Sequence, residues 1–371
     1  MVSFLDLTKA FDTVDHDILL HKLSHYGIRG VSNRLIRSYL SNRKQYVKIK
    51  DSQSEKLSVS CGVPQGSVLG PLLFLIYVND IAMSAPEGNI KLFADDTNAF
   101  IEHENINQLL ENAQFLLNYL FKWFRDNRLT VNACKSSFTI FTTKFKRSYN
   151  HIPNTICVNN TKIHIASSTR CLGVILDEDL NWKDHINQLC NGLKSYFSTF
   201  YNIRKSLSIR EIKAIYYTLI YSRIRYGLIL YGAASPVALK PIQILQNQLL
   251  KVLTGKKYRY STNQLHNELE LIKVKDMCKQ DILSFVFNHH LGKLPPIFDD
   301  YYSSFATIHE LNTRNRNTNF HIPLYYSSFG SSSLKVTGCI LWNDIDNEIK
   351  AVQSIKCFRK KLKDKCLPYV T

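Results

Sequence analysis

Two adjacent aspartates, Asp95 and Asp96, interrupt an apolar stretch that runs from residue 90 to residue 101. The flanking residues read as two short β-strands, and the acidic pair falls where a hairpin would turn. Carboxylates held side by side repel one another, and burying them costs several kcal/mol unless a cation compensates. Carboxylate oxygens suit the hard ion Mg²⁺, so the pair indicates a metal site. Aspartate is also frequent in exposed turns, which leaves an ordinary turn as the alternative.

Two upstream segments could bring further chemistry to this pair. Residues 2–12 read as an apolar strand that carries Asp6, followed by a turn toward a helix. Residues 61–74 form a Gly/Pro-rich loop that opens directly into an apolar helix, and its central residues are Pro64, Gln65 and Gly66. Glycines in such a loop allow the backbone to approach a ligand closely. Taken alone, Asp6 could equally be a carboxylate that caps the end of a strand.

In this order, the three segments resemble the palm domain of reverse transcriptases: its first catalytic strand, its Pro-Gln-Gly loop and its Phe-Ala-Asp-Asp hairpin. Residues 123–136 resemble the next motif of that family, residues 171–177 resemble its primer-grip hairpin, and residues 180–186 resemble the start of its thumb. The amino-acid sequences of the first two motifs are similar to those of non-LTR retrotransposons of the LINE type, with jockey-like elements as the nearest group. The resemblance covers roughly residues 2–186 and continues more weakly to the end of the chain.

The resemblance implies nucleotidyl transfer with two metal ions about 4 Å apart. It implies that Asp6 and Asp95 bridge both ions. It also implies that Asp96 completes the set, either by binding an ion directly or by supporting the residues that do. The backbone carbonyl of Leu7 is implied as a further ligand. The expected ions are two Mg²⁺, for which Mn²⁺ could substitute. Lys135 matches a lysine near the pyrophosphate, as a general acid or a phosphate clamp, although exposed lysines are common.

The family also implies contacts to the nucleotide and the primer. Phe11 stands where an aromatic ring lies under the incoming sugar and excludes a 2′-hydroxyl, and Ala10 beside it leaves room for that sugar. The alternative for Phe11 is a core aromatic at the start of a helix. Gln65 and its loop would contact the nucleotide or the templating strand. The turn that seats the primer backbone is expected at Cys171, Leu172 and Gly173.

The charge of the chain favours a polyanionic partner. The formal net charge is +17 and the pI is about 9.4, and nucleic acid is the expected partner of such an excess. Some cations would contact phosphates without reading sequence, while others are ordinary surface charge. The candidates for these contacts are Arg37, Arg43, Lys44, Lys144, Lys146, Arg147, Lys256, Lys257 and Arg259. The basic run at 359–365 fits a solvated helix face as well as a binding patch.

Several protein classes are disfavoured. Nine cysteines without a Cys-x-x-Cys pair argue against a disulfide framework and a zinc finger. Reduced thiols fit an intracellular protein, in the nucleus or the cytoplasm, and neither a signal peptide nor a membrane span is visible. The family implies an RNA template, a DNA primer and deoxynucleoside triphosphates as partners. The oligomeric state is left open.

The predicted fold is α/β in the broad sense (α+β): a reverse transcriptase palm over residues 1–180, a helical thumb over 181–260 and a C-terminal region of uncertain role over 261–371. Because the chain begins almost at the catalytic strand, the fingers and an upstream endonuclease are expected to be missing. An N-terminally truncated polymerase is therefore the main expectation. The alternative is an inactive remnant that binds nucleic acid through its charge alone. Further elements expected from periodicity are helices near 18–23, 33–39, 107–124 and 186–253, and strands near 45–50, 57–60, 129–131, 137–141 and 163–165.

Overall fold

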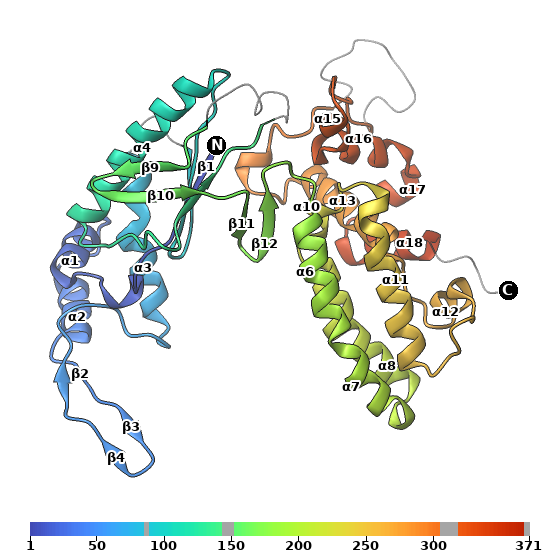
Figure 1. Ribbon diagram of the computed structural model, residues 1–371, viewed down its shortest axis with the longest axis horizontal. Helices are drawn as coiled ribbons and strands as arrows, with labels where there is room; N and C mark the ends of the chain where they lie inside the picture. Colours follow the sequence, from blue (N-terminus) through green and yellow to red (C-terminus); the bar gives the residue numbers. More distant parts are fainter. Residues whose placement is uncertain (85–88, 143–151, 305–317, 367–371) are drawn as a thin grey trace. The chain divides into compact units, whose positions relative to one another are not determined.

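The computed structural model describes residues 1–84, 89–142, 152–304 and 318–366 (Figure 1). The chain divides into two compact units, Met1–Leu180 and Asn181–Thr371. Every β-strand of the described residues lies in the first unit, and the second unit is helical. Among those same residues, no helix is long and apolar enough to cross a membrane.

A six-stranded mixed sheet forms the centre of the first unit. Its strand order is β6-β7-β1-β8-β10-β9, and β1 pairs antiparallel with β7 on one side and β8 on the other, whereas β8 and β10 are parallel. All four residues of β1 are buried, which fits the nearly continuous apolar sequence of a strand that is covered on both sides. The strands are β1 (Val2–Leu5), β6 (Asn89–Phe93), β7 (Asp96–Phe100), β8 (Ser137–Thr139), β9 (Thr155–Val158) and β10 (Thr161–Ile165).

Helices supply the rest of this core. The predicted helix at 107–124 is confirmed as α4 (Ile106–Asp126), which packs beside β9. The predicted helix at 18–23 is confirmed as α1 (His16–His25), and it packs against α2 (Gly30–Leu40) and α3 (Leu69–Val78). The side chain of Asp15 caps α1 by accepting a hydrogen bond from the backbone N–H of Ile18, which satisfies one of the free donors of the first turn.

The predicted strand at 129–131 was wrong. Val131 forms only an isolated bridge to Leu7, because the chain turns sharply on both sides of it. Arg128 has a positive φ of 53°, and the backbone N–H of Asn132 donates to the carbonyl of Asp6 at 2.8 Å. The predicted strand at 137–141 is confirmed in part, since β8 ends at Thr139.

Two hairpin structures of the first unit lie outside the six-stranded sheet. One pairs β11 (Ser168–Cys171) with β12 (Val174–Asp177). The other is a longer ribbon, in which the strands predicted near 45–50 and 57–60 are confirmed in part, because Lys48 and Ile49 pair instead with residues 52–53. Figure 1 shows this ribbon continuing away from α2. Its short strands are β2 (Lys44–Gln45), β3 (Lys48–Ile49), β4 (Ser52–Gln53) and β5 (Leu57–Ser58).

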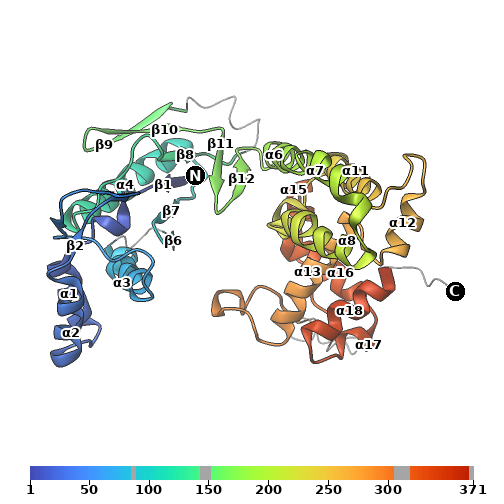
Figure 2. The same cartoon turned by 90° about the horizontal axis from the view of Figure 1, so that it is seen from below.

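The second unit consists of two helical layers. Figure 2 shows α6 (Lys183–Lys194), α7 (Tyr196–Ile203) and α11 (Pro236–Leu253) side by side. In the other layer α13 (Val274–His290) packs against α16 (Leu334–Asp344). The remaining α-helices are α8 (Ile209–Ile215), α9 (Ser222–Arg225), α10 (Leu228–Tyr231), α12 (Thr262–Glu268), α15 (Ser328–Ser332), α17 (Asn347–Lys350) and α18 (Ile355–Cys366).

The sequence predicted correctly that this unit is helical, but it did not predict where the helices are interrupted. The helical pattern expected over 186–253 is interrupted by a π-helical segment at Tyr216–Tyr221 and by Gly227, whose φ is 70°. Trp342 and Phe358 are both completely buried. They lie in one hydrophobic cluster, so α13, α16 and α18 share a core.

Candidate active site

The first carboxylate of the site follows directly after the central strand. Asp6 comes one residue after β1, and 29% of its side chain is exposed. Its backbone N–H donates to the hydroxyl of Ser136 at 3.1 Å, and its carbonyl accepts from the N–H of Asn132 at 2.8 Å. The segment around residues 132–136 therefore fixes the backbone that presents this carboxylate.

The acidic pair lies in the turn of the neighbouring hairpin. Phe93 pairs with Asp96 across β6 and β7, so Ala94 and Asp95 form a two-residue turn. Leu5 pairs with Thr97 between β1 and β7, and one further step in that register sets Asp6 opposite Asp96. Ala94 has a φ of 52°, a left-handed conformation that costs an L-residue about 1–2 kcal/mol. The hairpin predicted from the sequence is confirmed.

The three carboxylates act on one another electrostatically. Burial raises the pKa of the Asp96 carboxyl above its ordinary value, and the negative charges of Asp95 and Asp6 raise it further. No positive group is among the causes of this shift. All three side chains are only partly buried, so an ion could reach them from solvent.

The donor set suits a hard divalent cation, because it is made of carboxylate oxygens. In the conformation described, however, no three His, Cys, Asp or Glu side chains stand close enough together to hold a metal ion, as far as the described residues go. The side chains of Asp6, Asp95 and Asp96 would therefore have to rotate inward to share one. Aspartate has only two side-chain torsions, so such a closure costs little ordering entropy.

Lys135 is also brought to this site. Its Nζ lies 4.0 Å from Oδ2 of Asp6, and 70% of the lysine side chain is exposed. The tight turn that places it is closed by hydrogen bonds from the N–H groups of Lys135 and Ser136 to the carbonyl of Asn132, at 3.2 and 2.9 Å. An ion pair this exposed is worth little, so the ammonium group is free to move toward an arriving anion.

The turn after β1 places the two residues expected beneath the sugar. The ring of Phe11 stacks on that of Phe74 with centroids 4.4 Å apart, and it is partly buried against the core. Both interpretations of Phe11 therefore remain compatible with its position, since one face packs while part of the ring is accessible. Ala10 is only 3% exposed, so its methyl group belongs to the core, and its contact with a nucleotide stays a prediction.

The Gly/Pro-rich loop docks on the same turn. The N–H of Val63 donates to the carbonyl of Phe11 at 2.8 Å, and the side-chain amide of Gln65 donates to Oδ1 of Asp12 at 2.8 Å. A Cβ on Gly62 would lie 2.8 Å from the carbonyl oxygen of Asp12, and the φ of Gly62 is +88°. Only glycine fits this close approach, so loop and turn form one structural unit.

The central residues of this loop keep their access to solvent. Pro64 is half-buried, whereas Gln65 and Gly66 are exposed. Asp12, which orients Gln65, was not among the residues predicted for the site. Its position one residue after Phe11 in the strand-turn motif was the available signal, but nothing in the sequence shows that it faces a loop about fifty residues away.

The β11–β12 hairpin lies within the electrostatic reach of the same carboxylates. Leu172 and Gly173 form its turn with positive φ values of 47° and 82°, as a two-residue hairpin turn requires. Thr169 anchors β11 to the sheet, with its Oγ1 3.2 Å from Oγ1 of Thr139. Burial raises the pKa of the Cys171 thiol, and the charge of Asp96 raises it further. Of the three predicted primer contacts, Cys171 is thus within the electrostatic influence of Asp96.

The predicted phosphate contacts are divided between the two units. In the first unit they lie on α2 and the start of the ribbon, and in the second they follow α11, where Lys256 pairs with Glu268 at 3.2 Å. The exposed members are Arg37, Arg43, Lys44, Lys257 and Arg259. The predicted residues Lys144, Lys146 and Arg147 lie outside the described residues.

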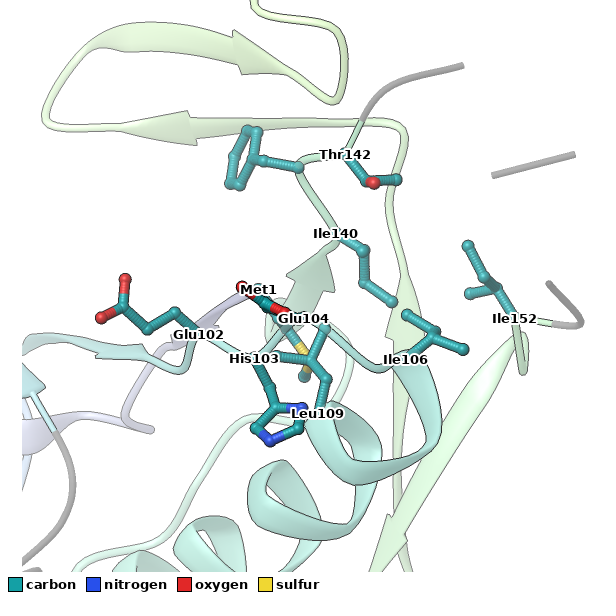
Figure 3. Close-up of a pocket in the computed structure, with 10 residues that line it drawn as sticks. Met1, Glu102, His103, Glu104, Ile106, Leu109, Ile140, Thr142 and Ile152 are labelled. Atoms are coloured by element: carbon teal, nitrogen blue, oxygen red, sulfur yellow. The ribbon is translucent and has the colours of Figure 1, made fainter. Parts of the chain in front are cut away.

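A separate pocket of about 220 Å³ lies at the opposite end of β1 from Asp6 (Figure 3). Met1, His103 and Leu109 line it together with residues near Ile140. None of the three aspartates borders this space. The candidate active site is therefore an open edge of the sheet and not this pocket.

Comparison with known proteins agrees with the geometry. Residues 1–176 match the family model described as reverse transcriptase (RNA-dependent DNA polymerase). The chain is 28% identical, over 284 residues, to a probable RNA-directed DNA polymerase from transposon X-element of Drosophila melanogaster, an alignment that covers 74% of this chain and 30% of that protein. It is 26% identical to the RNA-directed DNA polymerase from mobile element jockey of Drosophila funebris, over 75% of this chain and 31% of that protein. The chain thus spans about a third of the length of these relatives.

A solved structure of telomerase from Candida albicans, in complex with a fragment of telomeric RNA, aligns with 73% of this chain and 51% of that one. It is 12% identical and has a TM-score of 0.35. A likeness this low does not establish a shared fold, so the sequence matches carry the assignment. Residues 1–176 thus match the reverse transcriptase family, and over about three quarters of its length the chain is similar to RNA-directed DNA polymerases of mobile elements.

Proposed function

We propose that this chain extends a DNA primer on an RNA template by two-metal nucleotidyl transfer. The observation that carries the proposal is the strand register, which brings Asp6, one residue after β1, opposite the hairpin turn that holds Asp95 and Asp96. Burial raises the pKa of Asp96, and the charges of Asp95 and Asp6 raise it further. In this proposal residues 1–180 are the palm, residues 181–260 are a helical thumb, and residues 261–371 have no assigned role.

The three aspartates would hold two Mg²⁺ ions, or Mn²⁺ in their place. Asp6 and Asp95 would bridge both ions, with Asp96 and the carbonyl of Leu7 completing the set. When bound, such a pair of ions lowers the pKa of the attacking hydroxyl and stabilises the leaving group. The chain contributes the positions of these oxygens, which the backbone bonds around Asp6 and the strained turn at Ala94 hold at the edge of the sheet.

Three further side chains would handle the nucleotide. Lys135, 4.0 Å from Asp6, would move onto the phosphates and neutralise or protonate the leaving pyrophosphate. Phe11 would exclude a 2′-hydroxyl with the accessible part of its ring. Gln65, which Asp12 holds by a hydrogen bond, would contact the nascent base pair with its free carbonyl oxygen. Ala10, Pro64 and Gly66 would form the surface around these contacts.

The turn at residues 171–173 would support the primer strand. This role is supported by the pKa of the Cys171 thiol, which burial raises and which the charge of Asp96 raises further. Template and primer phosphates would add contacts to exposed cations, and this electrostatic part of the affinity would fall with rising salt.

Primer extension on poly(rA)·oligo(dT) with Mg²⁺ tests the proposal. The wild-type chain should incorporate dTTP, and the Asp95→Asn variant should not, while both bind the hybrid equally well in the absence of metal. If neither protein extends the primer although both bind it, the chain acts as an electrostatic nucleic-acid binder and the catalytic proposal is wrong.

A further inference from the structure

The ribbon between α2 and the Gly/Pro-rich loop is an element without a packing partner. All residues from Ser41 to Ser58 are exposed, and Figure 1 shows the ribbon extending away from α1 and α2. Its ends are held together by a hydrogen bond from the N–H of Val59 to the carbonyl of Arg43 at 2.9 Å. An isolated two-stranded ribbon is marginally stable in water, so an element of this length is expected to gain stability from a ligand.

The register of the ribbon separates its side chains onto two chemically different faces. Lys44 pairs with Ser58, and Lys48 pairs with Gln53. Between these pairs the second strand carries one extra residue, a β-bulge. Because side chains alternate along a strand, Tyr46 lies on the same face as Lys44 and Lys48. We call this the lysine face, and it is made of Lys44, Tyr46, Lys48 and Lys56.

The assignment of Lys56 to this face has independent support. Its Nζ lies 5.7 Å from the centroid of the Tyr46 ring, across the ribbon. The opposite face includes the uncharged residues Gln45, Val47, Ile49, Ser52 and Leu57, and the acidic residue Glu55 stands at the bulge. The three lysines do not occur in the ion pairs found among the described residues of the first unit. The lysine face therefore presents three cations outside any ion pair around one half-exposed aromatic ring.

We propose that the lysine face binds a single-stranded segment of nucleic acid, with lysines on the phosphates and a base stacked on Tyr46. Cations that follow the backbone, interleaved with an aromatic ring for an unstacked base, are the two elements of single-strand recognition. In a duplex the bases are already stacked and the ring would find no partner. The inference rests on the proposed function and deepens it, since a polymerase must hold its template where that strand is not yet paired.

A binding titration with a short fluorescent oligouridylate tests the lysine face. For the full chain, the double variant Lys48→Gln/Lys56→Gln should lose roughly ten- to thirty-fold in affinity at about 0.1 M salt, and its slope of log K against log salt should shrink by about 1.4, because each phosphate contact to a single strand contributes about 0.7. Tyr46→Leu should lose about five-fold or more with an unchanged slope, since stacking is worth roughly 1–3 kcal/mol per base.

Three matched variants separate the contact from general effects of charge and folding. Lys162→Gln removes an exposed lysine from β10 of the same unit and should leave binding unchanged. Ile49→Thr/Leu57→Thr alters the opposite face of the same ribbon and should bind as the wild type does. Lys48→Arg/Lys56→Arg keeps the charge and should keep the affinity. Equal circular dichroism spectra would show that the variants fold alike.

Three results would overturn the inference. They are wild-type affinity and slope in Lys48→Gln/Lys56→Gln, an equal loss of binding to a blunt duplex, and an equal loss of oligouridylate binding in the opposite-face variant, which would show that the affinity does not depend on the lysine face in particular. Primer extension measured on the same preparations keeps this separate from the proposed function. If the wild type extends the primer but the lysine variants bind as it does, only the ribbon inference is wrong. If the affinity depends on the lysines but no primer is extended, only the catalytic proposal is wrong.

Discussion

Burial raises the pKa of Asp96 in the first unit and that of Asp281 in the second, but the neighbouring charges act on the two carboxyls in opposite directions. At Asp96 burial is the largest cause, and the neighbouring acids Asp95 and Asp6 add to it. At Asp281 burial is again the largest cause, but Arg225 and then Arg359 act against it. Asp96 is therefore surrounded by other negative charges, whereas the negative charge of Asp281 is balanced by arginines.

The contacts of the two residues agree with this difference. Nε of Arg225 donates to both oxygens of Asp281, at 2.8 and 3.1 Å, and Nη1 donates to the hydroxyl of Tyr221 at 2.7 Å. In the first unit Lys135 reaches Asp6, a neighbour of Asp96, at 4.0 Å and remains 70% exposed. A matched buried charge holds a fold together, whereas an unmatched one indicates that the missing charge arrives with a ligand.

The largest effect is expected from Asp95→Asn. If the cluster works by holding divalent ions, losing one bridging carboxylate removes several kcal/mol of transition-state stabilisation, and 3 kcal/mol corresponds to about a hundred-fold in rate. Steady-state primer extension should therefore fall by at least about a hundred-fold. The apparent Tm should not fall, because one source of repulsion is gone. A variant that lost stability and activity together would place Asp95 among the structural residues and break the comparison.

The second effect concerns stability. Asp281→Ala leaves the Arg225 guanidinium without its partner, and breaking a buried pair costs about 3–5 kcal/mol. Because the Arg225 side chain keeps 26% of its exposure, we expect the lower end, which lowers Tm by about 6–12 °C for a unit of this size. Calorimetry measures the shift. The double variant Arg225→Met/Asp281→Leu should recover most of the lost Tm, since apolar replacements of an ion pair are tolerated. A double variant with a Tm no higher than that of the single variant would show that the broken ion pair does not cause the loss.

A third, intermediate case is Asp12, whose partner is the neutral amide of Gln65. Asp12→Ala should raise the KM for the nucleotide by about five-fold with little change in kcat, because losing one exposed hydrogen bond costs about 1 kcal/mol. Asp12→Asn keeps an acceptor oxygen and serves as the control. A fall in kcat as large as that of Asp95→Asn would place Asp12 with the unmatched carboxylates.

Local features of this site were accessible from the sequence, because they depend on neighbours along the chain. The hairpin at Asp95 follows from alternating apolar residues around a polar pair, and the helix α4 follows from its 3.6-residue period. The hydrogen bond between Asp12 and Gln65 and the ion pair between Arg225 and Asp281 span more than fifty residues each. No periodicity reports on such contacts, since they depend on how elements pack.

The same limit explains the two errors in the elements. Leu129 to Val131 has strand-like residues, but the positive φ of Arg128 and the bond from Asn132 to Asp6 bend the segment around the first carboxylate. The long helical pattern after residue 186 has an unbroken period, yet the chain turns at Gly227. In both places tertiary contacts outweigh local propensity.

The smallest effect is the pH dependence of stability at Asp96. A carboxyl whose pKa is higher in the folded than in the unfolded state destabilises the fold above the folded pKa, and this penalty disappears as the pH falls through that value toward 3.8. Asp96→Asn removes the penalty, so its apparent Tm should exceed that of the wild type by something of the order of 1 °C at pH 7, and the two curves should converge in acid.

Mg²⁺ sharpens this last measurement. An ion that binds only the folded state stabilises it, so Mg²⁺ should raise the Tm of the wild type and raise that of Asp96→Asn less. The Tm difference at pH 7 should then shrink or change sign when Mg²⁺ is added. The stability lost in Asp281→Ala should be the same with and without the ion, because Arg225 already supplies the positive charge there. An equal response of both sites to Mg²⁺ would mean that the ion acts on the whole chain, and the unmatched charge at Asp96 would no longer identify where it binds.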